Sequence, residues 1–200
     1  MDDQGNPATE DLYYCQQAGY NLYFTRNALV YEFYERKSPS GRVGKASLDI
    51  PVNSPKPEET ALRKFRLDMR FSGINPSTLI KSGGKRSTYH NYYRGGDVQS
   101  EFKEVGLFDT LFYRDIYPSI DLQFYLLPEG KGMKYDFIVH PGGDPSQISY
   151  TYVGADLLSQ QKSGDLHIIT PLGTLREEKP YSYQEIEGKT REVASAFRLK

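Results

Sequence analysis

The chain has 200 residues, the length of one ordinary domain, and its 25 Lys and Arg residues almost balance 26 Asp and Glu residues, for a net charge of −1. Because this balance supplies no basic field for a phosphate backbone, we expect no nucleic-acid partner. One Cys and three scattered His residues show no zinc-ligand spacing, so we expect no structural zinc site. The sequence shows neither a long apolar run nor a leader after Met1, so we expect no membrane insertion and no signal peptide.

The composition favours strands over helices. The chain has 17 Tyr and 10 Phe residues and no Trp, and aromatic side chains suit the half-buried surface of a sheet. It also has 18 Gly and 12 Pro residues, which interrupt the sequence at intervals too short for long helices. We therefore predict an all-β protein.

For the first part of the chain, the sequence pattern predicts a hairpin, a third strand and a long loop. Short aromatic runs at 12–17 and 21–25 flank Gly19, which is available for a positive φ. A further strand is predicted over 28–35. Four prolines and several serines then make 38–59 the best candidate for an exposed loop.

The next segment alternates strictly between apolar and charged residues. Over 61–71 this period of two predicts a strand with an apolar inner face and a charged outer face. The inward residues are Leu67, Met69 and Phe71, and the outward ones are Arg66, Asp68 and Arg70. Segment 72–86 is rich in Gly, Asn and Pro, so we predict turns there, and we predict that 88–97 is loop-like.

For the second half of the chain, the sequence pattern predicts a series of short antiparallel strands. Turn signals separate them at a spacing of 8 to 12 residues. Pro141 to Pro145 is the strongest of these turn signals. The expected strands cover 107–114, 120–126, 133–139, 148–152, 166–170, 174–178, 181–186 and 192–199.

Together these elements predict a single all-β domain over 1–200. The sheets are expected to pack as an antiparallel β-sandwich, either jelly-roll-like or as two small abutting sandwiches. Two sub-lobes, 1–100 and 101–200, are an alternative division of the same chain.

Most candidate catalytic and metal-binding patterns have a simpler structural interpretation. Five aspartates (Asp109, Asp115, Asp121, Asp136 and Asp144) lack the dense spacing of a calcium loop, so we interpret them as solvated strand faces. Cys15 lies within a predicted strand, where a buried structural thiol is expected. No nucleophile elbow accompanies His90, His140 or His167, so we predict no catalytic residues, no metal and no cofactor.

One cluster suits a ligand better than the others. Tyr89, His90, Tyr92, Tyr93 and Arg94 combine aromatic rings with hydrogen-bonding groups, as a site for a sugar ring or a peptide would. Aromatic residues where a loop meets a strand also commonly close the end of a sandwich core. The cluster is therefore both a candidate ligand-binding site and a candidate core plug.

Several longer motifs resemble a known family. They run in the expected order over nearly the whole chain: Asn21-Leu-Tyr-Phe-Thr25, Ala28-Leu-Val-Tyr31, Leu67-Asp-Met-Arg70, Asn91-Tyr-Tyr-Arg-Gly95, Tyr113-Arg-Asp-Ile-Tyr-Pro-Ser-Ile-Asp-Leu-Gln-Phe-Tyr125, Lys134-Tyr-Asp-Phe-Ile-Val-His-Pro-Gly-Gly-Asp-Pro145, Ile148-Ser-Tyr-Thr-Tyr-Val-Gly-Ala155, Gly164-Asp-Leu-His-Ile168 and Pro180-Tyr-Ser-Tyr-Gln184. The sequence resembles an N-terminal domain of unknown function from large secreted bacterial proteins. Those proteins also carry SBBP repeats related to β-propellers, PKD or other immunoglobulin-like modules, and gliding-motility-associated C-terminal sorting regions.

This resemblance implies an extracellular or cell-surface location and neighbouring domains as partners. It transfers no catalytic residue, because the family has none established. The chain departs from the family pattern at Ser119, where Gly is usual, and at Glu101-Phe102, where a Trp is common.

Three hypotheses for function follow. The first is a non-enzymatic structural or adhesive module of an exported bacterial surface protein, which binds glycan or protein. The second is a carbohydrate-active enzyme with a carboxylate pair, and the third is a scaffold that only packs against neighbouring domains. A flat tyrosine platform would favour binding, whereas exposed apolar patches away from any cleft would favour the scaffold.

Overall fold

The structure, a computed structural model, describes residues 13–17, 19–36, 62–92, 102–127 and 132–200. These residues form strands and connecting turns, with a 3-10 turn at Pro145–Gln147 and no α-helix, so the all-β prediction is confirmed. No described residue belongs to a helix able to cross a membrane. The strands are β1 (Tyr13–Gln17), β2 (Tyr20–Phe24), β3 (Ala28–Arg36), β4 (Leu62–Phe71), β5 (Leu79–Tyr92), β6 (Phe102–Tyr117), β7 (Ile120–Leu126), β8 (Met133–Val139), β9 (Tyr150–Val153), β10 (Leu157–Gln160), β11 (Leu166–Thr170), β12 (Gly173–Glu177), β13 (Ser182–Ile186) and β14 (Lys189–Val193).

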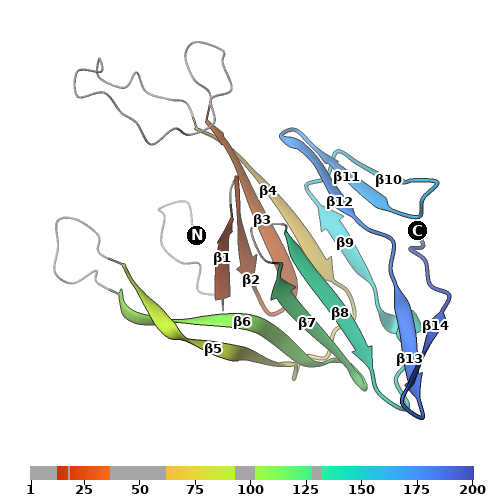
Figure 1. The fold of residues 1–200 in the computed structure, drawn as a ribbon. Coiled ribbons are helices and arrows are strands. Elements are labelled where there is room, and N and C mark those ends of the chain that lie inside the picture. The colour runs from red at the N-terminus through yellow and green to blue at the C-terminus, as the bar shows by residue number, and fades with distance from the viewer. Residues whose placement is uncertain (1–12, 18, 37–61, 93–101, 128–131) are drawn as a thin grey trace, which may run out of the picture. The chain divides into compact units, whose positions relative to one another are not determined.

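The strands are distributed over four sheets (Figure 1). The largest has the order β1-β2-β3-β4-β9, and a four-stranded sheet has the order β5-β6-β7-β8. A three-stranded sheet, β10-β11-β12, and a two-stranded hairpin, β13-β14, complete the described chain. In the four-stranded sheet, the three-stranded sheet and the β13-β14 hairpin, all paired strands are antiparallel.

The chain divides into two compact units, and strands β2, β3, β4 and β9 contribute residues to both. The first unit comprises Met1–Ala18, Tyr23–Ala28 and Arg70–Thr151, and the second comprises Gly19–Leu22, Leu29–Met69 and Tyr152–Lys200. The number of independent domains, and the jelly-roll form of the sandwich, stay predictions.

An aromatic cluster forms the core of the first unit. Phe124 of β7 lies at its centre and is 2% exposed, with the ring centroids of Phe24 at 5.2 Å and Tyr113 at 5.7 Å. Phe71 and Tyr135 complete the contacts to this ring. Burial raises the pKa of the Tyr113 hydroxyl, which donates a hydrogen bond to the Thr25 carbonyl oxygen at 2.6 Å. The inner face of the β5–β8 sheet thus packs on side chains of β2 and β4.

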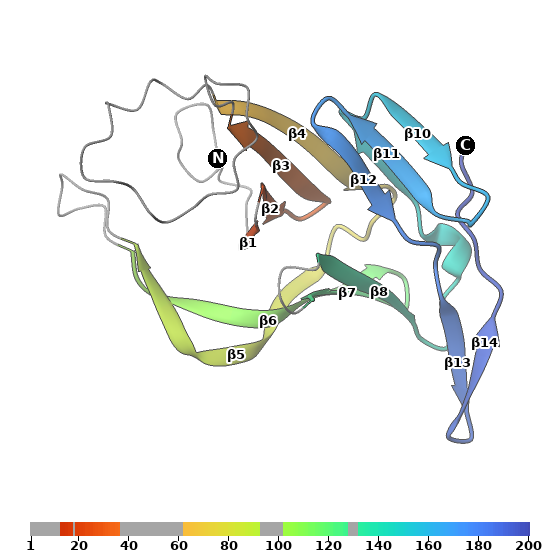
Figure 2. The ribbon, with the colours of Figure 1, turned by 45° about the horizontal axis from the view of Figure 1, so that its top comes forward.

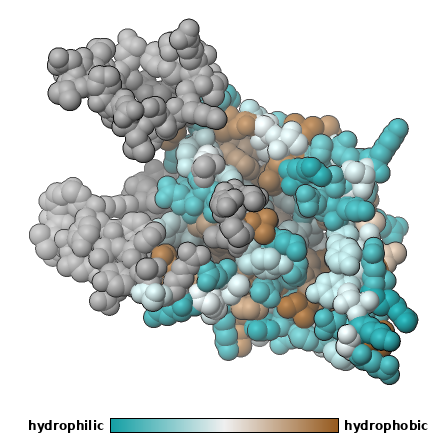
Figure 3. Space-filling model, in the orientation of Figure 1, coloured by the Kyte–Doolittle hydropathy of each residue, from teal (hydrophilic) through white to brown (hydrophobic). Residues whose placement is uncertain are grey.

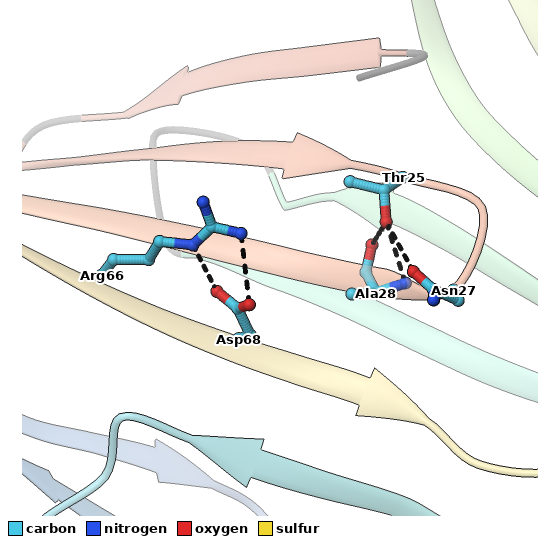
Figure 4. Close-up of polar contacts among 5 residues, drawn as sticks. All are labelled: Thr25, Asn27, Ala28, Arg66 and Asp68. Carbon is cyan, nitrogen blue, oxygen red and sulfur yellow. Dashed lines mark hydrogen bonds and ion pairs between the residues drawn. The ribbon is translucent and has the colours of Figure 1, made fainter. Parts of the chain in front are cut away.

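The turn between β2 and β3 shows how a polar residue is accommodated in this core. Thr25 is buried, and its hydroxyl oxygen accepts a hydrogen bond from the Ala28 N–H at 3.0 Å (Figure 4). The Thr25 N–H donates to the Ala28 carbonyl at 2.9 Å, which closes the hairpin. The Thr25 carbonyl also accepts the hydrogen bond from the Tyr113 hydroxyl. Thr25 therefore both follows the end of β2 and links this hairpin to β6.

The predicted alternation in β4 is confirmed for its apolar side. Leu67 and Met69 are 0% exposed and Phe71 is 6% exposed. On the outer side, which was predicted to be charged, Asp68 is only 4% exposed. Arg66 covers the Asp68 carboxylate with two hydrogen bonds, from Nε to Oδ1 at 2.7 Å and from the guanidinium to Oδ2 at 3.2 Å (Figure 4). This bidentate pairing compensates the burial of the charge.

Parts of two segments that were predicted to be turns or loops belong to a strand, whereas 72–78 form bends and turns as predicted. The residues over 79–92 form β5, which pairs with β6 along its length, and both strands are long and curved (Figure 2). The prediction relied on Gly83 and Gly84, but the ladder runs through them, with Gly84 at φ +65°. A register shift between Lys85 and Tyr89 then bends the strand instead of ending it.

The C-terminal strands also differ from the prediction. The last strand is β14, not a strand over 192–199, because Glu187 and Gly188 both have positive φ, 51° and 74°, and form a tight two-residue turn. This turn pairs Ile186 directly with Lys189. Strand β10, which the sequence reasoning missed, completes a three-stranded sheet with β11 and β12.

Candidate functional site

The structure places only part of the predicted aromatic cluster. Tyr89, His90 and Tyr92 lie on β5, opposite Gly106, Val105 and Phe102 of β6, so they belong to a strand and not to a loop. Tyr93 and Arg94 lie outside the described residues. Ligand binding by this cluster stays a prediction.

A second aromatic surface lies on the outer face of the β5–β8 sheet, within the first unit. The cross-strand pairs fix its membership, because directly opposed residues project from the same side of a sheet. One row consists of Lys81, Phe112, Gln123 and Asp136, and the next consists of Gly83, Thr110, Tyr125 and Lys134. We call these eight residues the outer face.

The aromatic rings of the outer face are partly exposed and flanked by cations. The Arg114 guanidinium lies 4.5 Å from the centroid of the Phe112 ring, and the Lys134 ammonium lies 5.7 Å from that of Tyr125. A Cβ atom on Gly83 would come within 3.1 Å of the Phe112 ring, so the absence of a side chain there leaves room for the ring. The Tyr125 hydroxyl donates a hydrogen bond to the Asp136 carboxylate, which holds both groups in place.

Two lysines of the outer face are available to a ligand. The side chains of Lys81 and Lys134 are exposed, and neither ammonium forms an ion pair within the part of the chain that the structure describes. Gln123 lies between Phe112 and Asp136 in the same row. A ring face beside an amide, a carboxylate and an ammonium can stack on a sugar ring and hydrogen-bond its hydroxyl groups.

A buried carboxylate borders the outer face. Asp121 of β7 is 4% exposed, and it accepts hydrogen bonds from the Arg114 guanidinium at 2.5 Å and from the Asp115 N–H at 2.8 Å. The His140 Nε2 atom lies 3.1 Å from the Asp121 Oδ2 atom. Burial raises the pKa of Asp121, but these hydrogen bonds and the Arg114 charge outweigh it and hold the pKa below its usual value. The prediction of a solvated aspartate is therefore wrong here, because neighbouring donors close over the carboxylate.

This cluster fixes the sharp connection between β6 and β7. Asp115 and Ser119 have positive φ, 51° and 58°, and the β6–β7 register shifts between Tyr113 and Tyr117. The Asp121 carboxylate binds the Asp115 N–H in this irregular segment, so its principal visible role is structural. The carboxylate keeps an otherwise strained turn in one conformation.

A second unusual carboxyl group lies in the second unit. Glu177 of β12 is paired with Leu166 of β11, so it shares the apolar face that buries Leu166 and Ile168. Burial raises the pKa of Glu177 to about 8. The Tyr152 hydroxyl donates a hydrogen bond to the Glu177 Oε2 atom at 3.1 Å. The raised pKa favours the neutral acid near pH 7, which makes Glu177 a candidate proton donor.

The remaining candidate groups have structural surroundings. Cys15 is half-buried on β1, and burial raises the pKa of its thiol, against a hydrogen bond from the Gln17 side chain. Asp144 accepts from the N–H and hydroxyl of Ser146 and caps the 3-10 turn at Pro145–Gln147. Among the described residues, no group of three or more His, Cys, Asp or Glu side chains is placed to hold a metal ion.

The fold and these surfaces define an all-β module built from antiparallel sheets, with an aromatic, charged face on one of them. Residues 2–200 match the model of a domain of unknown function, DUF7948. The chain belongs to this family. No curated protein and no solved structure matches it.

Proposed function

We propose that the chain is a non-enzymatic adhesive module of an exported bacterial surface protein, and that it binds glycan through the outer face. The gliding-motility and multidomain context belongs to this proposal and rests on the sequence motifs quoted above. Within it, neighbouring domains of the same protein are the structural partners.

One observation supports glycan binding above the others: Phe112 and Tyr125 present partly exposed rings next to polar side chains on one continuous sheet face. A core role does not account for these rings, because the inward positions of the same strands, Leu111 and Phe124, already form the buried layer. Sheet faces with aromatic rings and flanking hydrogen-bonding groups suit the flat, hydroxyl-rich surface of a sugar.

A glycan array with the purified chain tests this proposal. We expect Phe112→Ala and Tyr125→Ala to weaken the binding of whichever glycan the wild type retains by about tenfold or more, the equivalent of about 1.4 kcal/mol. Tyr14→Ala is the matched control, since it removes an exposed tyrosine from a different sheet. A Tyr92→Ala, Tyr93→Ala double variant tests the cluster predicted from sequence in the same way. Equal binding by the wild type and both outer-face variants, or no binding by the wild type, would contradict the proposal.

The raised pKa of Glu177 favours a second candidate function, a carbohydrate-active enzyme in which Glu177 is the general acid. This candidate predicts release of reducing sugar from a panel of polysaccharides by the wild type and none by Glu177→Gln. The adhesive proposal predicts no turnover by either protein. Turnover that depends on Glu177 would replace the first proposal with the second.

A further inference from the structure

The β13–β14 hairpin presents both of its faces to solvent. Every described residue of the two strands except Ser182 is exposed. The hairpin is nevertheless well formed, because five cross-strand pairs and the Glu187-Gly188 turn define its register. At its base, the Ser182 hydroxyl donates a hydrogen bond to the Ser195 hydroxyl at 2.8 Å.

The two faces of this hairpin carry opposite charges. The cross-strand pairs place Tyr183, Glu185, Thr190 and Glu192 on one side, and the ring of Tyr181 lies 5.9 Å from that of Tyr183. We call this side the acidic tyrosine face. The other side, the basic aliphatic face, carries Gln184, Ile186, Lys189, Arg191 and Val193.

Charge segregation of this kind is not explained within a single chain. Surface hairpins are stabilised when opposite charges lie across from each other on one face, whereas here like charges share each face. None of Glu185, Glu192, Lys189 and Arg191 forms an ion pair with any described residue. Each face therefore carries charges of one sign, and no opposite charge beside them neutralises them.

Large apolar groups accompany these charges. Tyr181 is 66% exposed and Tyr183 is 55% exposed on the acidic tyrosine face, while Ile186 is 47% and Val193 is 39% exposed on the other. In Figure 3, hydrophobic residues lie among strongly hydrophilic ones at the end where Figure 1 places β13 and β14. An isolated two-stranded ribbon is marginally stable in water, so covering either face would stabilise it.

We propose that the hairpin is a self-association surface, and that the acidic tyrosine face of one copy docks on the basic aliphatic face of a second copy. The charge complementarity of the two faces carries this inference. Stacking them would place the carboxylates of Glu185 and Glu192 against Lys189 and Arg191, and would remove the exposed aromatic and aliphatic groups from water together. The inference is independent of glycan binding, because the outer face belongs to another sheet.

The geometry also sets the strength and the form of the association. A face of a two-stranded hairpin is smaller than the roughly 800 Å² per partner of a stable complex, so the contact is weak and transient. Because two different faces meet, the contact is heterologous, and an open assembly keeps a free acidic tyrosine face at one end and a free basic aliphatic face at the other. Such a contact becomes effective when many copies are displayed together.

Analytical ultracentrifugation of the full chain over a concentration series tests the proposal. We expect the weight-average mass of the wild type to rise with concentration at low salt. It should fall toward the monomer mass at about 1 M NaCl, where the Debye length is about 3 Å. The rise should extend beyond the mass of a dimer, because the association is heterologous.

Charge reversal separates this mode from other modes of association. Glu185→Lys with Glu192→Lys makes both faces basic, and Lys189→Glu with Arg191→Glu makes both faces acidic, so each double variant alone should stay monomeric. An equimolar mixture of the two should associate, and the quadruple variant should recover self-association. Asp156→Lys is the matched control, since it reverses an exposed charge of the same unit outside the hairpin.

The result that would overturn the inference is equally specific. The inference of self-association is wrong if the wild type stays monomeric at every concentration and the mixture of double variants also fails to associate. It also falls if either double variant associates as the wild type does. Far-UV circular dichroism of each variant checks that the exposed substitutions leave the sheets intact, and a hairpin that merely loses its fold would not recover association in the mixture.

Discussion

At about pH 8, Glu177→Gln is expected to be more stable than the wild type by a few kcal/mol, whereas near pH 4.5 the two proteins should be similar. The cause is the burial of Glu177 on the apolar face of β12, which raises its pKa to about 8. Glutamine has the shape of the neutral acid, and its amide oxygen can still accept the hydrogen bond from the Tyr152 hydroxyl.

The sign of the pH dependence follows from proton linkage. An unfolded glutamate has a pKa of about 4.3, so between about pH 4.3 and pH 8 the folded chain binds more protons at this residue than the unfolded chain. The free energy of unfolding therefore decreases as the pH rises through this window. Asp121 and Asp165, whose pKa values are lowered, act in the opposite direction and only at more acidic pH.

Urea unfolding at a series of pH values measures this effect, with far-UV circular dichroism as the signal. Glu178→Gln is the matched control, because the adjacent Glu178 side chain is 81% exposed and its removal should leave the pH dependence unchanged. If Glu177→Gln loses stability with rising pH as steeply as the wild type, Glu177 is not the buried neutral acid described above.

The sequence pattern was sufficient to predict strands in which one face is wholly apolar. In β7, and over 66–71 of β4, large apolar inward residues alternate with charged, polar or amphipathic outward residues, so a period of two is visible without structural knowledge. The same logic failed in β5. There, Lys81 and Lys85 are exposed and Gly83 and Gly84 occupy the centre, so the strand lacks an apolar stripe and is held by its pairing with β6.

The buried carboxylates could not be predicted from alternation alone. Asp68 and Asp121 occupy outward positions of their strands, as predicted, yet both are buried, because arginine side chains reach over them. The pattern specifies which side of a sheet a residue occupies, but the covering of that side depends on long side chains from two or more residues away. For Asp121, the available signal was Arg114 seven residues earlier across a short turn.

The β13–β14 hairpin illustrates a similar limit. A strand over 181–186 was correctly expected, since β13 covers Ser182–Ile186. The segregation of charge depends, however, on the cross-strand register, which a two-residue turn at Glu187-Gly188 determines. A turn longer or shorter by one residue would place Lys189 and Arg191 on the side of Glu185 and abolish the segregation.

Replacement of Phe124 by alanine is expected to cost about 3 to 5 kcal/mol of unfolding free energy, the usual range for removing a fully buried phenylalanine. The ring is 2% exposed, and Phe24, Phe71, Tyr113 and Tyr135 all contact it, so no neighbouring side chain is positioned to fill the space without disturbing the others. Phe124→Leu should lose less, because leucine keeps much of the buried volume.

The adjacent residue is the matched control for this prediction. Tyr125 has a similar ring but projects from the outer face, so Tyr125→Ala should cost only about 1 kcal/mol or less. Urea unfolding of both variants, followed by tyrosine fluorescence and circular dichroism, compares them directly, since the chain has no Trp. Similar losses for the two variants would mean that both sides of β7 are buried. The outer face would then be a covered surface and unable to bind a glycan, so the stability of Tyr125→Ala bears on the proposed function as well as on the fold.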